Sequence, residues 1–268
     1  MSELRVDQLP EGWSTGAAVY HDQFEPFTVA YSQSAMAMLQ LAPSSRVLDV
    51  AAGSGAFTIL AAQAGAAVTA IDFAPGMVEL LERRLAAESL AGTTFEMDGQ
   101  QLTFESDSFD AACSMFGLMF FPDAARGVTE LCRVTRTGGP ILVGTWDVDG
   151  FSLGRLVRSA IQSVVPELPE PSPPGWAPLG TQQGLADLLE HAGLADVEVH
   201  PVAHPWQFDD AREFFRRLPD WSPPMKPLLS SLPAELFTAA ADCFADSVAA
   251  LGADGLAALA WLGMGRAR

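Results

Sequence analysis

Short apolar runs alternate with amphipathic stretches over the first half of the chain. The clearest, V-L-D-V-A-A-G-S-G-A-F-T at residues 47–58, is an apolar run that contains an acid near its end and passes through glycines into a helical pattern. Two further runs, 68–72 and 93–98, also end in an aspartate. A strand, a helix and their loops need roughly 20 to 30 residues, so this spacing predicts successive βα units of one parallel sheet.

The stretches between these runs have the pattern of amphipathic helices. Residues 74–87 place apolar side chains such as Met77 and Leu81 on one face, as a helix packed on a sheet requires. A later helix is expected to begin after Asp123 as its N-cap and to end before the glycine pair at 138–139.

We expect an α/β fold, namely a doubly wound, Rossmann-like, seven-stranded and mostly parallel sheet with a helical N-terminal cap and lid insertions. The cap is predicted at residues 1–45 and the main domain at 46–268, with insertions at about 151–180 and 204–253. The second half is predicted to contain helices at 181–192, 211–218 and 234–251, strands at 197–199 and 256–264, and an irregular, proline-rich surface excursion at 151–178.

The composition indicates a large core under a strongly acidic surface. Of the 268 residues 49% are hydrophobic, and 33 acidic against 15 basic side chains give a formal net charge of −18. Such a surface repels phosphate backbones, so we expect no nucleic-acid partner. No apolar run reaches the roughly 20 residues of a membrane helix, and the first residues lack an export signature. We therefore expect a cytoplasmic protein without a membrane span.

The cysteines give no sign of a metal site. Cys113, Cys132 and Cys243 lie far apart in the sequence and show no C-x-x-C spacing. We expect them to be small hydrophobic side chains in a reducing compartment, and we expect no bound metal.

Three aspartates are expected at one edge of the sheet. Asp49, Asp72 and Asp98 stand near the carboxyl ends of three successive parallel strands, which meet at the same rim. The glycine turn at 53–55 lets the backbone approach a ligand closely. Thr58 occupies the place of the third glycine of a dinucleotide fingerprint, and Asp49 is poorly placed beside a pyrophosphate. The acidic rim suits a nucleoside cofactor that carries ammonium and sulfonium groups.

At these residues the sequence resembles the class I S-adenosylmethionine-dependent methyltransferases, and most closely their small-molecule branch, type 11, which is ubiquinone/menaquinone-methyltransferase-like. The motifs that carry the resemblance are L-D-V-A-A-G-S-G at 48–55, D-F-A-P-G-M at 72–77, the acid at 98, F-D-A-A-C-S-M-F-G-L-M-F-F-P-D at 109–123 and L-C-R-V-T-R-T-G-G-P at 131–140. The resemblance is close over about residues 46–145. Ala51 replaces the usual first glycine, and Met119 and Phe120 stand where many members carry histidine.

The resemblance implies S-adenosylmethionine as the cofactor, with S-adenosylhomocysteine as the product. It implies contacts of Asp72 with the ribose hydroxyls, of Phe73 and Met77 with the adenine ring, and of Asp98, Gly99 and Gln100 with the adenine edge. The residues that it assigns to the methionine end of the cofactor are Asp49, Ala51, Gly53, Ser54, Gly55 and Ser114.

The implied function is transfer of a methyl group to a small, largely apolar molecule, at oxygen, nitrogen or carbon, by in-line displacement. Alignment of the nucleophile and exclusion of water are then the main tasks. A base is needed only if the acceptor loses a proton; the candidates are His21, His204 and Asp147, and no residue is assigned a catalytic role. The cap and the insertions supply an aromatic set, part of which is expected at the acceptor: Phe24, Phe27, Trp176, Trp206, Phe214, Phe215, Trp221 and Phe237.

Other functions remain open at this point. One is an enzyme of the same fold that leaves the methyl group in place and catalyses decarboxylation or cyclisation. Another is a non-catalytic cofactor-binding or scaffold protein. A nicotinamide-dependent oxidoreductase ranks last because of Thr58 and Asp49. Monomer and homodimer are both compatible with the sequence.

Overall fold

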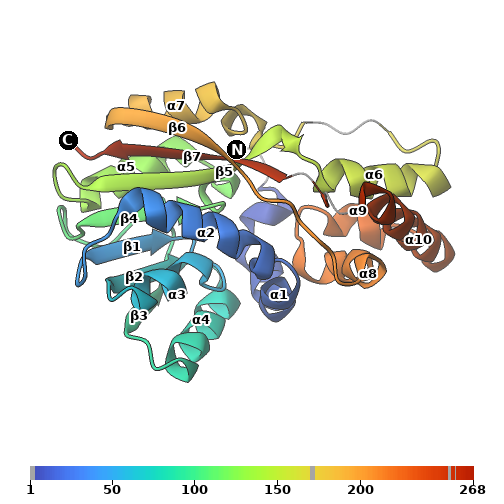
Figure 1. The fold of residues 1–268 in the computed structure, drawn as a ribbon, viewed down its shortest axis with the longest axis horizontal. Coiled ribbons are helices and arrows are strands. Elements are labelled where there is room, and N and C mark those ends of the chain that lie inside the picture. Colours follow the sequence, from blue (N-terminus) through green and yellow to red (C-terminus); the bar gives the residue numbers. More distant parts are fainter. Residues whose placement is uncertain (1–3, 170–172, 253–254, 257) are drawn as a thin grey trace.

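The structure is a computed structural model that describes residues 4–169, 173–252, 255–256 and 258–268. Its strands are β1 Arg46–Val50, β2 Ala67–Asp72, β3 Gly92–Glu96, β4 Ala111–Met115, β5 Pro140–Phe151, β6 Ala195–Ala203 and β7 Ala258–Arg266. They form one seven-stranded sheet in the order β3-β2-β1-β4-β5-β7-β6 (Figure 1). Strands β1 to β5 pair in parallel, and β7 is antiparallel to both β5 and β6. The predicted doubly wound, mostly parallel α/β fold is confirmed.

The order of the strands creates a crevice beside β1. The chain adds β2 and β3 on one side of β1 and then places β4 on the other, pairing Val47 with Ala111 and Asp49 with Cys113. The helices that follow β1 and β4 therefore leave in different directions, and the space between the carboxyl ends of these strands is open to a ligand.

Most helices lie where the sequence predicts them. They are α1 Pro10–Gln23, α2 Glu25–Leu39, α3 Ala56–Gln63, α4 Pro75–Ala87, α5 Ala124–Val134, α6 Leu153–Val164, α7 Gln182–His191, α8 Ala211–Trp221, α9 Lys226–Ser230 and α10 Ala234–Leu251. As predicted, the Asp123 side chain caps α5 by accepting from the Arg126 N–H at 3.0 Å. Thr181 caps α7 in the same way, accepting from the Gly184 N–H at 3.0 Å.

The prediction of an irregular segment from Phe151 to Pro178 is wrong for its first half. Residues 153–164 form α6, whose buried face consists of Leu153, Val157, Ala160 and Ile161 at helical spacing. The many prolines that suggested irregular structure all come later. Three residues of that proline-rich stretch, 170–172, lie outside the described residues.

The N-terminal helices cover the sheet, and the later helices gather at one end of it. On α2, Ala35 and Leu39 pack with Val47 of β1 and Phe57 of α3. Helices α6 and α8 both pack on α10, and Figure 1 shows this group beyond the end of β5. The division into a cap at 1–45 and a main domain at 46–268 with two insertions stays a prediction.

An aromatic core joins these helices to the sheet. Trp146 of β5 stacks on Phe116 with ring centroids 3.9 Å apart, and Phe27 of α2 stacks on Trp206 at 4.4 Å. Such pairs stabilise beyond the area that they bury. The N-terminal helices and the end of the sheet therefore share one hydrophobic core.

Tyr31 fixes α2 to the last strand. Its side chain is buried, and its hydroxyl donates to the carbonyl oxygen of Ala258 in β7 at 2.6 Å. The Tyr31 ring also meets the His204 ring edge to face, with centroids 4.8 Å apart. A helix near the start of the chain is thus bonded to a strand near its end.

We expect Tyr31→Phe to lower the free energy of unfolding by about 1–3 kcal/mol, because it leaves a buried carbonyl group without this donor. Urea unfolding followed by circular dichroism measures the change. Ser163→Ala, which removes an exposed hydroxyl bonded within its own helix, serves as the control and should stay within about 0.5 kcal/mol of the parent. Equal stability of Tyr31→Phe and the parent would show that the bond contributes nothing.

Candidate functional site

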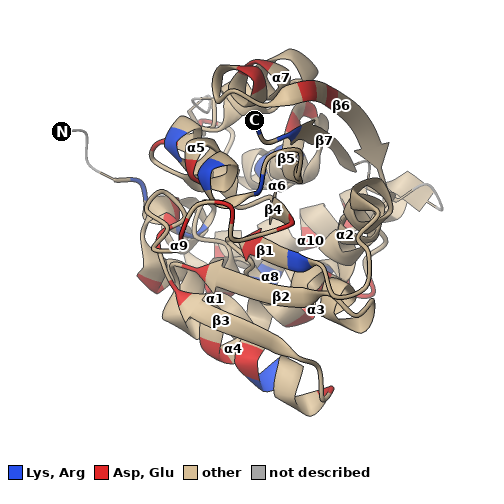
Figure 2. Cartoon of the chain, turned by 90° about the vertical axis from the view of Figure 1, so that its left-hand side faces the viewer, with Lys and Arg blue, Asp and Glu red and all other residues tan. Residues whose placement is uncertain are grey.

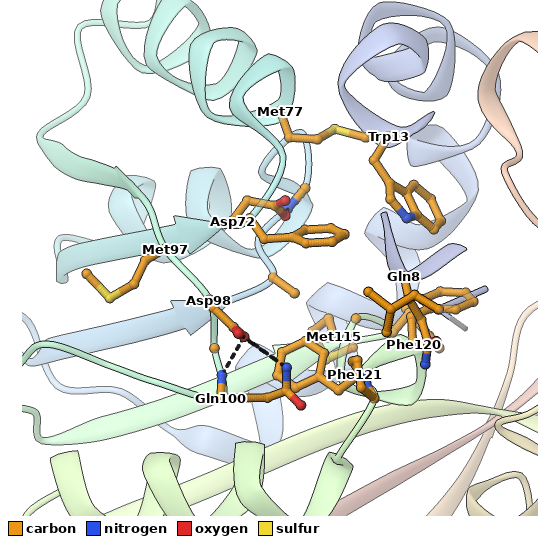
Figure 3. Close-up of a pocket in the computed structure, with 18 of the residues that line it drawn as sticks. Gln8, Trp13, Asp72, Met77, Met97, Asp98, Gln100, Met115, Phe120 and Phe121 are labelled. Atoms are coloured by element: carbon orange, nitrogen blue, oxygen red, sulfur yellow. Dashed lines mark hydrogen bonds between the residues drawn. The ribbon is translucent and has the colours of Figure 1, made fainter. Parts of the chain in front are cut away.

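Two adjoining cavities lie at the carboxyl edge of β1, β2 and β4. The main cavity has a volume of about 220 Å³ and is lined by Leu4, Gln8, Trp13, Tyr20, Ala51, Gly53, Asp72, Phe73, Met77, Met97, Asp98, Gly99, Gln100, Met115, Phe116, Gly117, Phe120, Phe121 and Pro122 (Figure 3). The side cavity, of about 40 Å³, is lined by Tyr20, Thr28, Ser32, Asp49, Ala51, Ala52, Gly53, Ser54, Ala56, Phe57, Met115 and Phe116. Residues such as Tyr20 and Gly53 line both, so the two cavities share a wall.

Asp72 is a buried carboxylate in the wall of the main cavity. One of its oxygens accepts from the Gly53 N–H at 2.8 Å and the other from the Ala74 N–H at 2.9 Å. Each carboxylate oxygen has two lone pairs, so each retains capacity for a hydroxyl donor. Burial raises the pKa of Asp72 to about 6, against the lowering effect of these hydrogen bonds.

Asp49 is a second buried carboxylate, at the side cavity. It accepts from the Thr58 hydroxyl at 2.6 Å, and the Cys113 thiol lies 3.6 Å from its other oxygen. Burial raises the pKa of Asp49 to about 7, and the nearby charge of Asp72 adds to the rise. Thr58, which distinguishes the turn from a dinucleotide fingerprint, thus orients this carboxylate.

Asp98 lies at the exposed rim of the main cavity. Its carboxylate accepts from the backbone N–H of Gln100 at 2.8 Å and from the Gln100 side-chain amide at 3.1 Å, as Figure 3 shows. The Gln100 side-chain oxygen in turn accepts from the Asp123 N–H at 2.9 Å. This chain of bonds holds the loop after β3 against the start of α5.

The cavities contain acidic groups and no basic ones. Among the described lining residues, the ionisable carboxylates are Asp49, Asp72 and Asp98, and neither lysine, arginine nor histidine is present. Tyr20 stands where the cavities meet, and burial raises the pKa of its phenol well above the ordinary value, so the phenol stays neutral. An acidic, buried hollow of this kind favours a cationic ligand.

The backbone of the turns is shaped for close approach. Gly53 has φ +56°, and a methyl group added to it would meet no atom within 4 Å, so its open side faces space. Ala51 is also left-handed, with φ 56°. A methyl group added to Gly117 would lie 2.2 Å from the Ala51 methyl carbon. The loops after β1 and β4 therefore touch where the Ala51 methyl group packs against Gly117, and any side chain at position 117 would collide with that methyl group.

The structure brings together all but two of the residues predicted to bind a cofactor. Gly55 is the N-cap of α3 and lines neither cavity. Its φ of 101° favours glycine, and a methyl group there would lie 2.3 Å from the Leu81 side chain of α4. Ser114 is buried and its hydroxyl has no hydrogen-bond partner, yet it lines neither cavity. The predicted positions that do line the cavities are Asp49, Ala51, Gly53, Ser54, Asp72, Phe73, Met77, Asp98, Gly99 and Gln100.

The candidate bases have other partners. His21 lies 3.2 Å from Glu25, and His204 lies 3.3 Å from the Ser34 hydroxyl. The Asp147 side chain accepts from the Asp149 N–H at 3.0 Å and from the Trp261 ring at 2.7 Å. None of the three candidate bases lines either cavity.

The aromatic rings at the main cavity differ from the set named on sequence. Phe24, Phe27, Trp206, Phe214, Phe215 and Trp221 are buried in the core, Trp176 and Phe237 pack against it, and none of the eight lines either cavity. The rings that line the main cavity are Trp13, Tyr20, Phe73, Phe116, Phe120 and Phe121. Trp13 and Phe120 pack against each other in its wall, with centroids 5.2 Å apart. The motif F-G-L-M-F-F-P at 116–122, already singled out on sequence, was the available signal for the last three rings.

Comparison with known proteins gives a match over the first part of the sheet. Residues 47–139 match the family described as a methyltransferase domain. An uncharacterized protein of Mycobacterium tuberculosis is 40% identical over 132 residues, which is 48% of this chain and 48% of that protein. The demethylmenaquinone methyltransferase of Clavibacter sepedonicus is 33% identical over 164 residues, or 57% of this chain and 66% of that protein. The chain spans about half the length of the first curated relatives that it matches.

Solved structures share the fold at low identity. The YcgJ protein of Bacillus subtilis superposes with a TM-score of 0.60 at 18% identity, covering 89% of this chain and 99% of that one. The [4+2]-cyclase SpnF gives a TM-score of 0.56 at 17% identity, covering 89% and 80%. These likenesses show the fold.

In the part of the chain that the structure describes, no helix has the length and apolarity to cross a membrane.

The Ala51–Gly117 contact predicts a specific rescue. Gly117→Ala should lower the free energy of unfolding by about 1–3 kcal/mol, because two methyl carbons cannot lie 2.2 Å apart. Ala51→Gly alone should stay within about 1 kcal/mol, since relief of the left-handed alanine offsets the greater freedom of the unfolded chain. The double variant should recover most of the loss in urea unfolding. A double variant as unstable as Gly117→Ala would contradict this account.

Proposed function

We propose that the chain is a class I S-adenosylmethionine-dependent methyltransferase, because residues 47–139 match a methyltransferase domain, and that it methylates a small, largely apolar molecule. The observation that carries the proposal is the pair of buried carboxylates, Asp49 and Asp72, on either side of the open Gly53 turn. The Asp72 carboxylate can accept hydrogen bonds from the two hydroxyls of a diol. The negative charges of Asp49 and Asp72 would attract a sulfonium or ammonium group.

The residues present fit S-adenosylmethionine. We propose that Asp72 holds the ribose hydroxyls, that Phe73 and Met77 hold the adenine ring, and that the side cavity around Asp49 takes the methionine end. When bound, this cofactor supplies an activated methyl group on a sulfonium centre. Gly53 contributes an unobstructed backbone surface.

The protein's contribution to the reaction is alignment in a dry space. Tyr20, Met115 and Phe116 line both cavities and surround the junction where the reacting groups would meet. These apolar or neutral side chains exclude water, and the neutral Tyr20 phenol can donate a hydrogen bond. Since no described histidine lines the site, we propose that the acceptor reacts without a histidine base.

The lining supports an uncharged acceptor with an aromatic or isoprenoid character. Trp13, Phe120 and Phe121 offer ring faces, and no described basic side chain is available to pair with a phosphate or carboxylate of the acceptor. The relative named demethylmenaquinone methyltransferase makes a quinol-like ring a reasonable first acceptor to assay. The precise atom that is methylated is left to that assay.

The charge pattern bears on partners. The chain has 33 acidic and 15 basic side chains, and in Figure 2 acidic positions lie on many elements while α4 and α5 also carry basic ones. We propose that the protein acts on a small molecule in the cytoplasm, as a monomer or homodimer, without a nucleic-acid partner.

A second candidate function is cyclisation or another reaction that leaves the methyl group in place. The structural neighbour named as a [4+2]-cyclase has the same fold. Incubation with acceptor and S-adenosylmethionine labelled in the methyl group separates the two: methyl transfer yields a labelled product, and the alternative converts the acceptor without label. A scaffold protein would do neither.

Asp72→Asn tests the proposed cofactor site directly. The substitution places an amide N–H₂ against one of the two backbone N–H donors, of Gly53 or Ala74, and removes the charge, so S-adenosylmethionine affinity should fall about tenfold to a hundredfold in isothermal titration. Asp107→Asn, at an exposed carboxylate on another loop, is the matched control and should bind as the parent does. If the parent releases no heat at millimolar S-adenosylmethionine, the proposed function fails.

The raised pKa values predict a pH dependence of binding. Asp49 and Asp72, with pKa values of about 7 and 6, are ionised above pH 7 and become neutral as the pH falls. The cation S-adenosylmethionine binds the ionised form better, so its affinity should fall about tenfold or more from pH 8 to 5.5. S-adenosylhomocysteine lacks the sulfonium charge and should lose less. Equal losses for both ligands in titrations over this range would argue against a sulfonium beside these carboxylates.

A further inference from the structure

We propose that Glu25 is a positioning residue that sets the width of the side cavity by tying the N-terminal helices to the glycine turn and to α4. This inference rests on the proposed function, because it concerns how the site receives the amino-acid end of S-adenosylmethionine. No motif of the sequence pointed to Glu25, which is the first residue of α2.

The Glu25 carboxylate is the centre of a buried cluster. Its oxygens lie 2.7 and 2.8 Å from one guanidinium nitrogen of Arg84 on α4, and one of them accepts from the Ser54 hydroxyl. Arg84 also donates to the Ser54 carbonyl oxygen. His21 of α1 lies 3.2 Å from the same carboxylate. Four separate segments of the chain therefore meet at one side chain.

Burial makes this cluster a rigid junction. The Glu25 and Arg84 side chains are only 4% and 18% exposed. Removing one partner of a buried ion pair leaves the other charge without compensation, so the two side chains hold each other in place. The bonds to both the hydroxyl and the carbonyl of Ser54 fix that residue relative to the same two side chains.

The cluster lies directly beside the side cavity. Thr28 and Ser32 follow Glu25 by three and seven residues on α2, hence on the same helix face, and both line the cavity. Ser54 and Gly53 line it from the turn. One wall of the cavity is thus α2, the other is the glycine turn, and Glu25 is the bond between the two walls.

The cavity wall carries hydrogen-bonding capacity that the protein does not use. Ser32 is 1% exposed, and its hydroxyl has no hydrogen-bond partner among the residues that the structure describes. A buried hydroxyl of this kind needs a partner, and the carboxylate or ammonium group of an amino acid would supply one. Only the spacing between α2 and the turn decides whether such a group reaches both walls.

Glu25 also controls the charge at the site. Arg84 is a cation that contacts the turn at the Ser54 carbonyl oxygen, and Glu25 pairs with it there. Burial, and after it the Glu25 charge, raises the pKa of Tyr20, which stands where the two cavities meet. Without Glu25, the guanidinium charge would oppose the ammonium group of the amino-acid end, which S-adenosylmethionine and S-adenosylhomocysteine share. The loss of the Glu25 carboxylate would thus both free the width of the side cavity and leave the Arg84 charge unpaired, and both changes should weaken binding of the amino-acid end.

The test compares a ligand that has the amino-acid part with one that lacks it. For Glu25→Gln, isothermal titration should show at least a tenfold loss of affinity for S-adenosylhomocysteine and less than a twofold loss for 5′-methylthioadenosine. In Glu25→Gln/Arg84→Met, which also removes the unpaired guanidinium, the affinity for S-adenosylhomocysteine should recover only by the part that is due to that charge, because the tie to Ser54 stays broken. Asp110→Asn, which breaks surface ion pairs with Arg46 and Arg136, is the control and should leave both affinities unchanged.

The outcomes separate this inference from the proposed function. If the parent binds neither ligand, both fail. Suppose instead that the parent binds both ligands. If Glu25→Gln then lowers the two affinities equally, or lowers neither affinity, the positioning role is overturned and the proposed function stands. Should Glu25→Gln not fold in thermal unfolding, Glu25→Asp replaces it. That variant keeps the charge but shortens the side chain that reaches Ser54 and Arg84, and a selective loss of about threefold for S-adenosylhomocysteine is expected, with no selectivity overturning the role.

Discussion

The site depends on the burial of carboxylates at the carboxyl edge of a parallel sheet. Asp49 and Asp72 are withdrawn from water, and their pKa values rise accordingly. Backbone N–H groups of Gly53 and Ala74 and the Thr58 hydroxyl hold them in defined positions. Their desolvation opposes ionisation of the free protein, and a cationic ligand would relieve it. The same geometry therefore accounts for the shape of the turn, the identity of the ligand and the expected response to pH.

The N-terminal helices complete the site instead of merely covering it. Tyr20 of α1 stands between the two cavities, and Thr28 and Ser32 of α2 form a wall of the smaller one. The position of these helices is fixed from two sides, by Glu25 at the glycine turn and by Tyr31 at β7. A site assembled from strand ends alone would be open, and the two helices enclose it.

The sequence predicts the parts of the site that are encoded locally. The strand-terminal acids and the glycine turn carry their meaning within a few residues, so Asp49, Gly53 and Asp72 were identified and lie together as expected. Trp13 and Tyr20 reach the site only because α1 folds back over it. No local sequence pattern predicts this tertiary position of α1. The position of α6 was missed because nearby prolines obscured a short amphipathic repeat. Gly55, a residue of the same motif, lines neither cavity, and both its positive φ and the nearby Leu81 side chain require a glycine there.

The hydrogen bond between Tyr31 and Ala258 constrains the order in which the protein folds during synthesis. The Tyr31 hydroxyl and the Ala258 carbonyl are 227 residues apart in the chain, and β7 lies between β5 and β6 in the sheet. The first helices thus leave the ribosome long before the strand on which they are to be anchored. Contacts of such high sequence separation form late in folding. During synthesis, α2 is therefore without this anchor until the ribosome has added the residues of β7.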